Sequence, residues 1–346
     1  MRRIILLILI ALFFITPVSA MEFTAPEVPD MAEEYMPEDT QSFTEGLWYV
    51  FKMTLEKLQP SFTEAAGVCL SLTAVCILCS LLNCGTDRAK IPITFAGTLA
   101  ISALLILPAN SLIALGVETI KQLSEYGKLL LPVLTAALAA QGGITTSTSL
   151  YCGTAVLNAV LSAILAHIIT PLLYIYLCLC IACNMISQPL LKNLKDFSKW
   201  AMTWCLKTLL YIFTGYLSIT KVISGTVDAS TMKATKLAIS GAVPVVGGLI
   251  SDASETILVS AGLMKNAAGT YGLLAVLSIW LSPFLRIGCQ YLLLKLTSAV
   301  CAVMGNQENA SLISDFSGAM GILLAMTGTI CLLLMVSTVC FMKGVS

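Results

Sequence analysis

Long apolar runs separated by short polar clusters make up most of this chain. A helix needs about 20 apolar residues to cross roughly 30 Å of hydrocarbon, and the charge-free stretch 129–191 is long enough for about three crossings. With breaks expected in the polar segment 141–149 and at Thr170-Pro171, the pattern predicts about nine transmembrane helices. They are expected at 65–83, 91–117, 129–147, 150–169, 171–191, 200–220, 266–285, 287–305 and 316–342.

The first 64 residues have a different pattern. Arg2 and Arg3, the apolar run 4–15 and the small residues at 18–20 are typical of a secretory signal peptide, although an uncleaved signal anchor would fit the same residues. Cleavage after Ala20 would leave residues 21–60 outside the cytoplasm, and ten of the 19 acidic residues precede residue 65. The predicted regions are a signal peptide at 1–20, an acidic extracytoplasmic tail at 21–64 and a polytopic transmembrane domain at 65–346.

The second half of this tail predicts an amphipathic helix over 43–58. Its apolar residues recur at intervals of three and four, as on one face of a helix. Such a helix lies either on the outer membrane surface or a partner, or against the protein's own membrane body, and periodicity does not distinguish the two. The residues concerned are Phe43, Leu47, Val50, Phe51, Leu55 and Leu58.

Composition supports an all-α polytopic membrane protein. Of the 346 residues 58% are hydrophobic and 11% charged, whereas soluble domains carry about 25% charged residues. The 19 basic and 19 acidic residues cancel, so no overall positive field exists to hold a nucleic acid. Most of the 13 cysteines lie in apolar runs, where thiols act as small hydrophobes, and no metal or cofactor is predicted. No G-x-S-x-G elbow, Walker A sequence or His/carboxylate cluster is present, so no enzyme is expected.

Orientation follows from the excess of Lys and Arg in cytoplasmic loops. With the tail outside, nine spans place the residues Arg88, Lys90, Lys192, Lys195, Lys199, Arg286 and Lys343 inside the cell. The same count places Glu308 and Asp315 outside.

Three ionisable residues inside apolar runs are candidates for function. Lys207 and Lys295 lie well within predicted spans, where an unpaired ammonium is costly. Their side chains either snorkel to the nearer interface or pair with another helix, because neither has an acid at helical spacing. His167, near the end of a predicted span, is either a proton-relay group or simply hydrogen bonded.

The segment 237–265 predicts a broken or re-entrant helical hairpin. Its glycines and proline interrupt an apolar sequence, which a membrane tolerates only where the backbone is buried in protein or lines a wet cavity. Asp252 and Glu255 have capping-box spacing, and Lys265 suits a helix C-terminus. A place at a channel mouth or subunit interface is compatible with capping. The candidate residues are Gly241, Pro244, Gly247, Gly248, Asp252, Glu255, Lys265 and Asn266.

This segment resembles the stage III sporulation protein AE family of endospore-forming bacteria. The resemblance rests on the run Gly241-Ala-Val-Pro-Val-Val-Gly-Gly248 and on Ser251-Asp252-Ala253, Glu255-Thr256 and Lys265-Asn266, preceded by Ser224-Gly225, Asp228 and Lys236. It extends to the order of signal peptide, acidic tail and polytopic body. The tail is short for the family, so a role that needs a folded external domain is not expected.

The resemblance implies a channel or export-gate subunit in the mother-cell membrane around the forespore, needed for late forespore development. It implies as partners a secretion-type ATPase, ring-forming proteins of the intermembrane space and a forespore-membrane protein. A homo-oligomer is expected, since a pore wider than one bundle needs several copies. The alternative is a secondary transporter that moves a small solute by itself, with Lys207, Lys295, Asp252 or Glu255 as coupling groups.

Overall fold

The computed structural model describes residues 26–37, 42–83, 90–186, 188–242 and 247–343, without the side chains of 30–31, 83, 90–91 and 217–264. The predicted signal peptide and Pro244 lie outside the described residues. All regular structure in these ranges is helical. The elements are α2 (Asp30–Glu33), α3 (Phe43–Glu56), α4 (Gln59–Asn83), α5 (Lys90–Ala140), α6 (Ile144–Ile164), the π-helix η2 (Leu165–Ile169), α7 (Thr170–Met185), α8 (Pro189–Ala242), α9 (Gly247–Val303) and α10 (Gln307–Met342).

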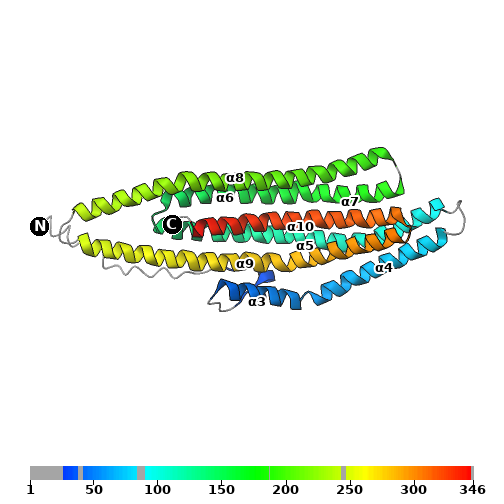
Figure 1. The fold of residues 1–346 in the computed structure, drawn as a ribbon, viewed down its shortest axis with the longest axis horizontal. Coiled ribbons are helices and arrows are strands. Elements are labelled where there is room, and N and C mark those ends of the chain that lie inside the picture. The colour runs from blue at the N-terminus through cyan, green and yellow to red at the C-terminus, as the bar shows by residue number, and fades with distance from the viewer. Residues whose placement is uncertain (1–25, 38–41, 84–89, 187, 243–246, 344–346) are drawn as a thin grey trace.

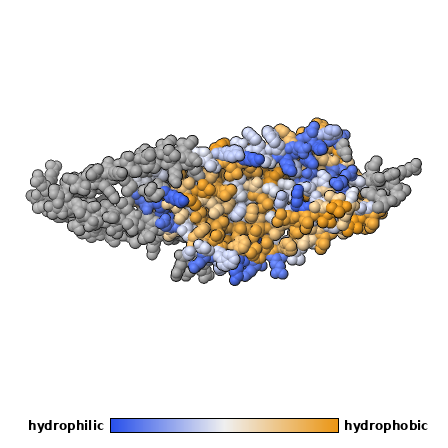
Figure 2. Space-filling view, viewed as in Figure 1, coloured by the Kyte–Doolittle hydropathy of each residue, from blue (hydrophilic) through white to orange (hydrophobic). Residues whose placement is uncertain are grey.

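The long helices lie along one axis, with α10 at the centre (Figure 1). α10 packs against α5, α6, α7, α8 and α9, and its inward side chains, such as Phe316, Leu323 and Ile330, are almost completely buried. Apolar side chains cover much of the visible surface, and hydrophilic ones gather beside the start of α8 and on α3 (Figure 2). An apolar exterior is the surface expected of a protein whose solvent is lipid.

The predicted count of nine spans is not confirmed. Within the described residues, five helical segments are long and apolar enough to cross a membrane. They are Gln59–Leu82, Pro92–Ala140, Ile144–Met185, Lys265–Val303 and Gln307–Met342. Three of them each unite two predicted spans, because the polar residues taken as loops lie within continuous helix.

The middle of α5 shows why the count differs. Glu118, Lys121, Glu125 and Lys128 separate two predicted spans in the sequence, but in α5 they recur at intervals of three and four along one outward face. The side chain of Gln122 donates a hydrogen bond to Glu118 across one turn, at 3.3 Å. Polar side chains on one face of a helix change the medium that surrounds that part of the helix. The backbone hydrogen bonds continue through it, so the helix does not end there.

The predicted break at Thr170-Pro171 is also helical. Pro171 lies in the first turn of α7, directly after the π-helix η2. A π-turn contains one extra residue, and the Thr170 hydroxyl donates to the Leu165 carbonyl at 2.9 Å. This wider turn accommodates the proline, so 150–169 and 171–191 do not form two separate spans.

Three helix connections lie at the same end of the bundle (Figure 1). α4 ends there and α5 begins, α7 is followed by α8, and α9 is followed by α10. The Ser80 hydroxyl of α4 donates to the Met304 carbonyl at 2.8 Å, and Lys195 of α8 contacts Asp315 of α10 at 2.7 Å. The prediction that Lys195 and Asp315 lie on opposite sides of the membrane is therefore wrong.

The amphipathic helix predicted over 43–58 is present as α3, which packs on α9. The side that α3 buries is a narrow one, formed by Gly46, Val50 and Thr54. Leu47, Phe51 and Leu55, half of the predicted apolar face, stay exposed, and the neighbouring Trp48 keeps 67% of its surface accessible. The helix thus contacts the protein's own body and still presents aromatic residues outward.

Glycines let α5 and α10 approach closely. A Cβ added at Gly116 would lie 2.6 Å from a Leu323 methyl carbon, and one added at Gly127 would lie 2.7 Å from a Leu334 methyl carbon. Gly116 and Gly127 are 11 residues apart on α5, and Leu323 and Leu334 are 11 residues apart on α10. Equal spacing in the same order is expected for two helices that run in the same direction. Small residues at such positions are what allow helix backbones to pack closely in membranes.

Candidate functional site

An open groove of about 540 Å³ lies between α8, α9 and α10. Its floor is a row of small α10 residues spaced three or four apart, one above the other on one helix face. α8 forms one wall, with Leu206 and Leu210, and α9 forms the other, with Tyr291. The floor residues are Ser314, Gly318, Gly321, Ala325 and Gly328.

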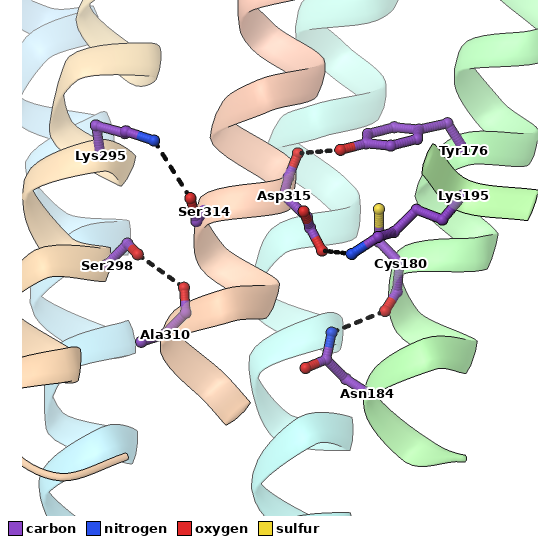
Figure 3. Close-up of polar contacts among 9 residues, drawn as sticks. All are labelled: Tyr176, Cys180, Asn184, Lys195, Lys295, Ser298, Ala310, Ser314 and Asp315. Atoms are coloured by element: carbon purple, nitrogen blue, oxygen red, sulfur yellow. Dashed lines mark hydrogen bonds and ion pairs between the residues drawn. The ribbon is translucent and has the colours of Figure 1, made fainter. Parts of the chain in front are cut away.

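Three lysines give the groove its chemistry. Lys199 and Lys207 come from α8, and Lys295 comes from α9. Lys295 Nζ donates a hydrogen bond to the Ser314 hydroxyl at 3.3 Å (Figure 3). Lys199 Nζ lies over the floor, since a Cβ added at Gly318 would be 3.4 Å away from it. Within the described part of the chain, none of the three lysines forms an ion pair.

Among the described residues that line the groove, Asp315 is the acidic one, and a fourth lysine neutralises it. Lys195 Nζ lies 2.7 Å from Asp315 Oδ2, with only 13% and 15% of the two side chains exposed (Figure 3). Burial alone would lower the pKa of Lys195, but the hydrogen bond and the charge of Asp315 outweigh it and raise this pKa above its ordinary value. Because Asp315 is paired with Lys195, it does not balance the positive charge of Lys199, Lys207 and Lys295.

The structure brings together two of the predicted intramembrane charges. Lys207 and Lys295 come from different helices and line the same groove. His167 is not among the lining residues; it lies exposed in η2, with its Nδ1 3.2 Å from the Ala163 carbonyl oxygen of the preceding turn.

The residues predicted around the broken segment lie elsewhere. α8 ends at Ala242 and α9 begins at Gly247, and residues 243–246 between them lie outside the described part of the chain. Gly241 is in the last turn of α8, and Gly247, Gly248, Asp252 and Glu255 are in the first turns of α9. Further along α9, Lys265 is 4% exposed and Asn266 is exposed. Lys265 and Asn266 are the two whose side chains the structure describes, and neither lines the groove.

Sequence reasoning missed the groove's floor and its ion pair. Lys195 and Lys199 were interpreted only as basic residues that mark the cytoplasmic side. The signal that could have found the floor is the spacing of small residues from Ser314 to Gly328, which places them on one face of a helix.

The regular structure of the described ranges is helical and includes five candidate spans, which defines a helical membrane protein. The family model for stage III sporulation protein AE matches residues 30–344, so the chain belongs to that family. The stage III sporulation protein AE of Bacillus subtilis (strain 168) is 24% identical over 242 residues, which are 69% of this chain and 60% of the relative. The match thus spans less than two thirds of that relative. No solved structure matches the chain.

Proposed function

We propose that this chain is a non-enzymatic channel or export-gate subunit of the stage III sporulation complex. It would act in the mother-cell membrane around the forespore and be needed for late forespore development. Membership of the family supports the sporulation role, and the five candidate spans support the membrane location. The link between two cells is inferred from the shape of the molecule.

The observation that carries this proposal is the length of α8 and α9. With 54 and 57 residues, these helices are about 80 and 85 Å long, whereas the hydrocarbon core of a bilayer is about 30 Å thick. Their hairpin extends past the C-terminal end of α10 and past the turn between α5 and α6 (Figure 1). When the body occupies a membrane, this arm therefore reaches beyond it, as a contact across the space between two membranes requires.

The charges of the opposite end agree with this orientation. Lys192, Lys195 and Lys199 lie in the first turns of α8, at the end away from the arm. Basic residues favour the cytoplasmic side, so the arm would point out of the mother-cell cytoplasm, as would the acidic tail after signal-peptide cleavage. A secretion-type ATPase would then meet the lysine-rich end.

The tip of the arm is the proposed contact with the ring-forming proteins and the forespore-membrane partner. It comprises the end of α8 at Gly241 and the start of α9 at Gly247 and Gly248, with Asp252 and Glu255 just beyond. Several copies arranged around a common axis would enclose the conduit.

A stand-alone permease is the second candidate, because lysines inside a membrane groove are typical of a substrate pathway. The positions of the charged residues along α9 limit which of them such a permease could use. Glu255 and Lys295 are 40 residues apart on the continuous helix α9, which is about 60 Å. They cannot belong to one coupling site, so such a permease would depend on the groove lysines alone.

Co-purification from sporulating cells tests the proposal. The tagged full chain is solubilised in mild detergent, and its partners are identified beside a sporulation assay. We expect recovery of the ATPase and ring proteins, and we expect Asp252→Asn with Glu255→Gln to reduce it about tenfold. The matched control is Glu118→Gln with Glu125→Gln, which removes the same charge from the α5 face and should leave recovery unchanged.

A chain that purifies alone, from cells whose deletion mutant sporulates normally, would contradict the channel-subunit proposal. Solute uptake by vesicles containing the purified chain, abolished by Lys207→Gln with Lys295→Gln, would then favour the permease. Equal losses of partners in the tip variant and its α5 control would show that the tip is not the contact.

A further inference from the structure

The groove between α8, α9 and α10 contains three lysines that have no acidic partner among the residues the structure describes. Lys199, Lys207 and Lys295 line it, and Asp315 is already paired with Lys195. An ammonium without a counter-charge is costly at membrane depth. The three lysine side chains are exposed along the open groove, with Lys295 hydrogen bonded to Ser314 and Lys199 lying over Gly318. An occupant with negative charge would complete the groove.

The lining changes from polar to apolar along α10. At one end are Ser314 and Gly318, with the ammonium groups of Lys295 and Lys199 above them. The floor then continues through Gly321, Ala325 and Gly328 between leucine side chains. From residue 314 to residue 328 this floor is about 21 Å long. A small polar anion would use only the first part, whereas an amphiphile with a phosphate and a hydrocarbon chain fits both.

The position of the polar end suits a membrane lipid. Ser314 is seven residues from Gln307, where α10 begins, so the lysine end is about 10 Å from the end of the helix. The interfacial layers of a bilayer lie outside the hydrocarbon core, and basic pockets between transmembrane helices bind anionic head groups there. Lys192 at the start of α8 lies at this same end.

We propose that this groove binds an anionic phospholipid. Its phosphate is held by Lys199, Lys295 and Ser314, and one acyl chain lies along Gly321, Ala325 and Gly328. Lys207, eight residues after Lys199 on α8 and so about 12 Å further along, reaches back toward the glycerol ester region with its flexible stem. The absence of side chains on the glycines leaves room for the acyl chain. This inference does not rest on the proposed function.

The test measures lipid binding to the purified full chain by native mass spectrometry in mild detergent. Phosphatidylglycerol is titrated, with phosphatidylcholine as the uncharged reference. Replacing both Lys199→Gln and Lys295→Gln should weaken phosphatidylglycerol binding about 30-fold, from the attraction of two lysines to an anionic lipid. The control, Lys52→Gln with Lys121→Gln, removes two exposed lysines outside the groove and should change binding less than twofold.

A second variant tests the hydrocarbon part without changing charge. A Cβ added at Gly328 meets nothing within 4 Å, so Gly328→Leu begins its side chain in open space on the floor of the groove. We expect it to weaken phosphatidylglycerol binding about tenfold, because it occupies the acyl-chain path. Gly288→Leu on α9, also with nothing within 4 Å of the added Cβ and outside the groove, is the matched control and should have no effect.

Competition separates a lipid from a soluble anion. Inorganic phosphate and glycerol phosphate at millimolar concentration should not displace phosphatidylglycerol. Displacement by either, together with normal binding by Gly328→Leu, would show a solute site and overturn the proposal. Equal weakening by the exposed-lysine control would show nonspecific attraction and would also overturn it. Unchanged helix content by circular dichroism establishes that each variant is folded.

Discussion

Replacing Asp315 with Asn removes the counter-charge of Lys195 and keeps the shape of the side chain. The pair has its Nζ and Oδ2 atoms 2.7 Å apart and is 13% and 15% exposed. Breaking a fully buried pair costs about 3–5 kcal/mol, and exposed pairs contribute about 0–1 kcal/mol. This pair is mostly but not fully withdrawn from solvent, so we expect Asp315→Asn to lower the free energy of unfolding by about 2–3 kcal/mol.

The assay is the apparent unfolding temperature of the purified chain in mild detergent, followed by circular dichroism. At about 2 °C per kcal/mol, appropriate for a long chain, the expected fall is about 5 °C at pH 7. Glu56→Gln is the matched control, because the Lys52–Glu56 pair is 65% and 59% exposed with its atoms 3.8 Å apart. It should shift the temperature by less than about 1 °C.

The pH dependence gives a second measurement on the same pair. The pKa of Lys195 is raised by Asp315 despite the opposing effect of burial. The stabilisation is therefore complete below the ordinary lysine pKa of about 10.4 and is lost as the pH rises through the higher pKa of the folded state. The difference between the native chain and Asp315→Asn should shrink above this range. A fall no larger than that of Glu56→Gln at pH 7 would refute this reasoning.

Two further predictions concern packing and the membrane surface. Gly116→Leu should lower the unfolding temperature by an amount equivalent to about 1–3 kcal/mol, because the added Cβ would lie 2.6 Å from Leu323; an equal fall in Gly288→Leu, where the added Cβ is unopposed, would contradict this. Trp48, 67% exposed on α3, should insert into the lipid interface, so Trp48→Phe should reduce the quenching of tryptophan fluorescence by brominated lipid in vesicles. Unchanged quenching would mean that this face of α3 does not contact lipid.

Local sequence patterns predict which segments are helical better than they predict the residues at which the helices begin and end. The periodicity over 43–58 corresponds to α3, and Gly241 and Gly247 lie at the end of α8 and the start of α9. The span limits were drawn at charged clusters, on the assumption that a helix ends where the membrane ends. In α5 the cluster from Glu118 to Lys128 lies within continuous helix, because helical hydrogen bonds are made within the backbone and persist when the surrounding medium changes.

The candidate site shows how such an error in helix limits changes the chemistry that can be predicted. Where two predicted spans are in fact one continuous helix, the prediction contains one membrane crossing too many. The side of the membrane predicted for every later residue is then reversed. Two such pairs precede Lys195, in α5 and in α6–α7, so their errors cancel there. The third pair lies in α9, between Lys195 and Asp315, and its error remains. The sequence therefore assigned these two residues to opposite sides, and their 2.7 Å contact could not be anticipated. Lys207 and Lys295 were identified individually from the cost of charge in a membrane, but their common groove depends on α10 packing between their helices.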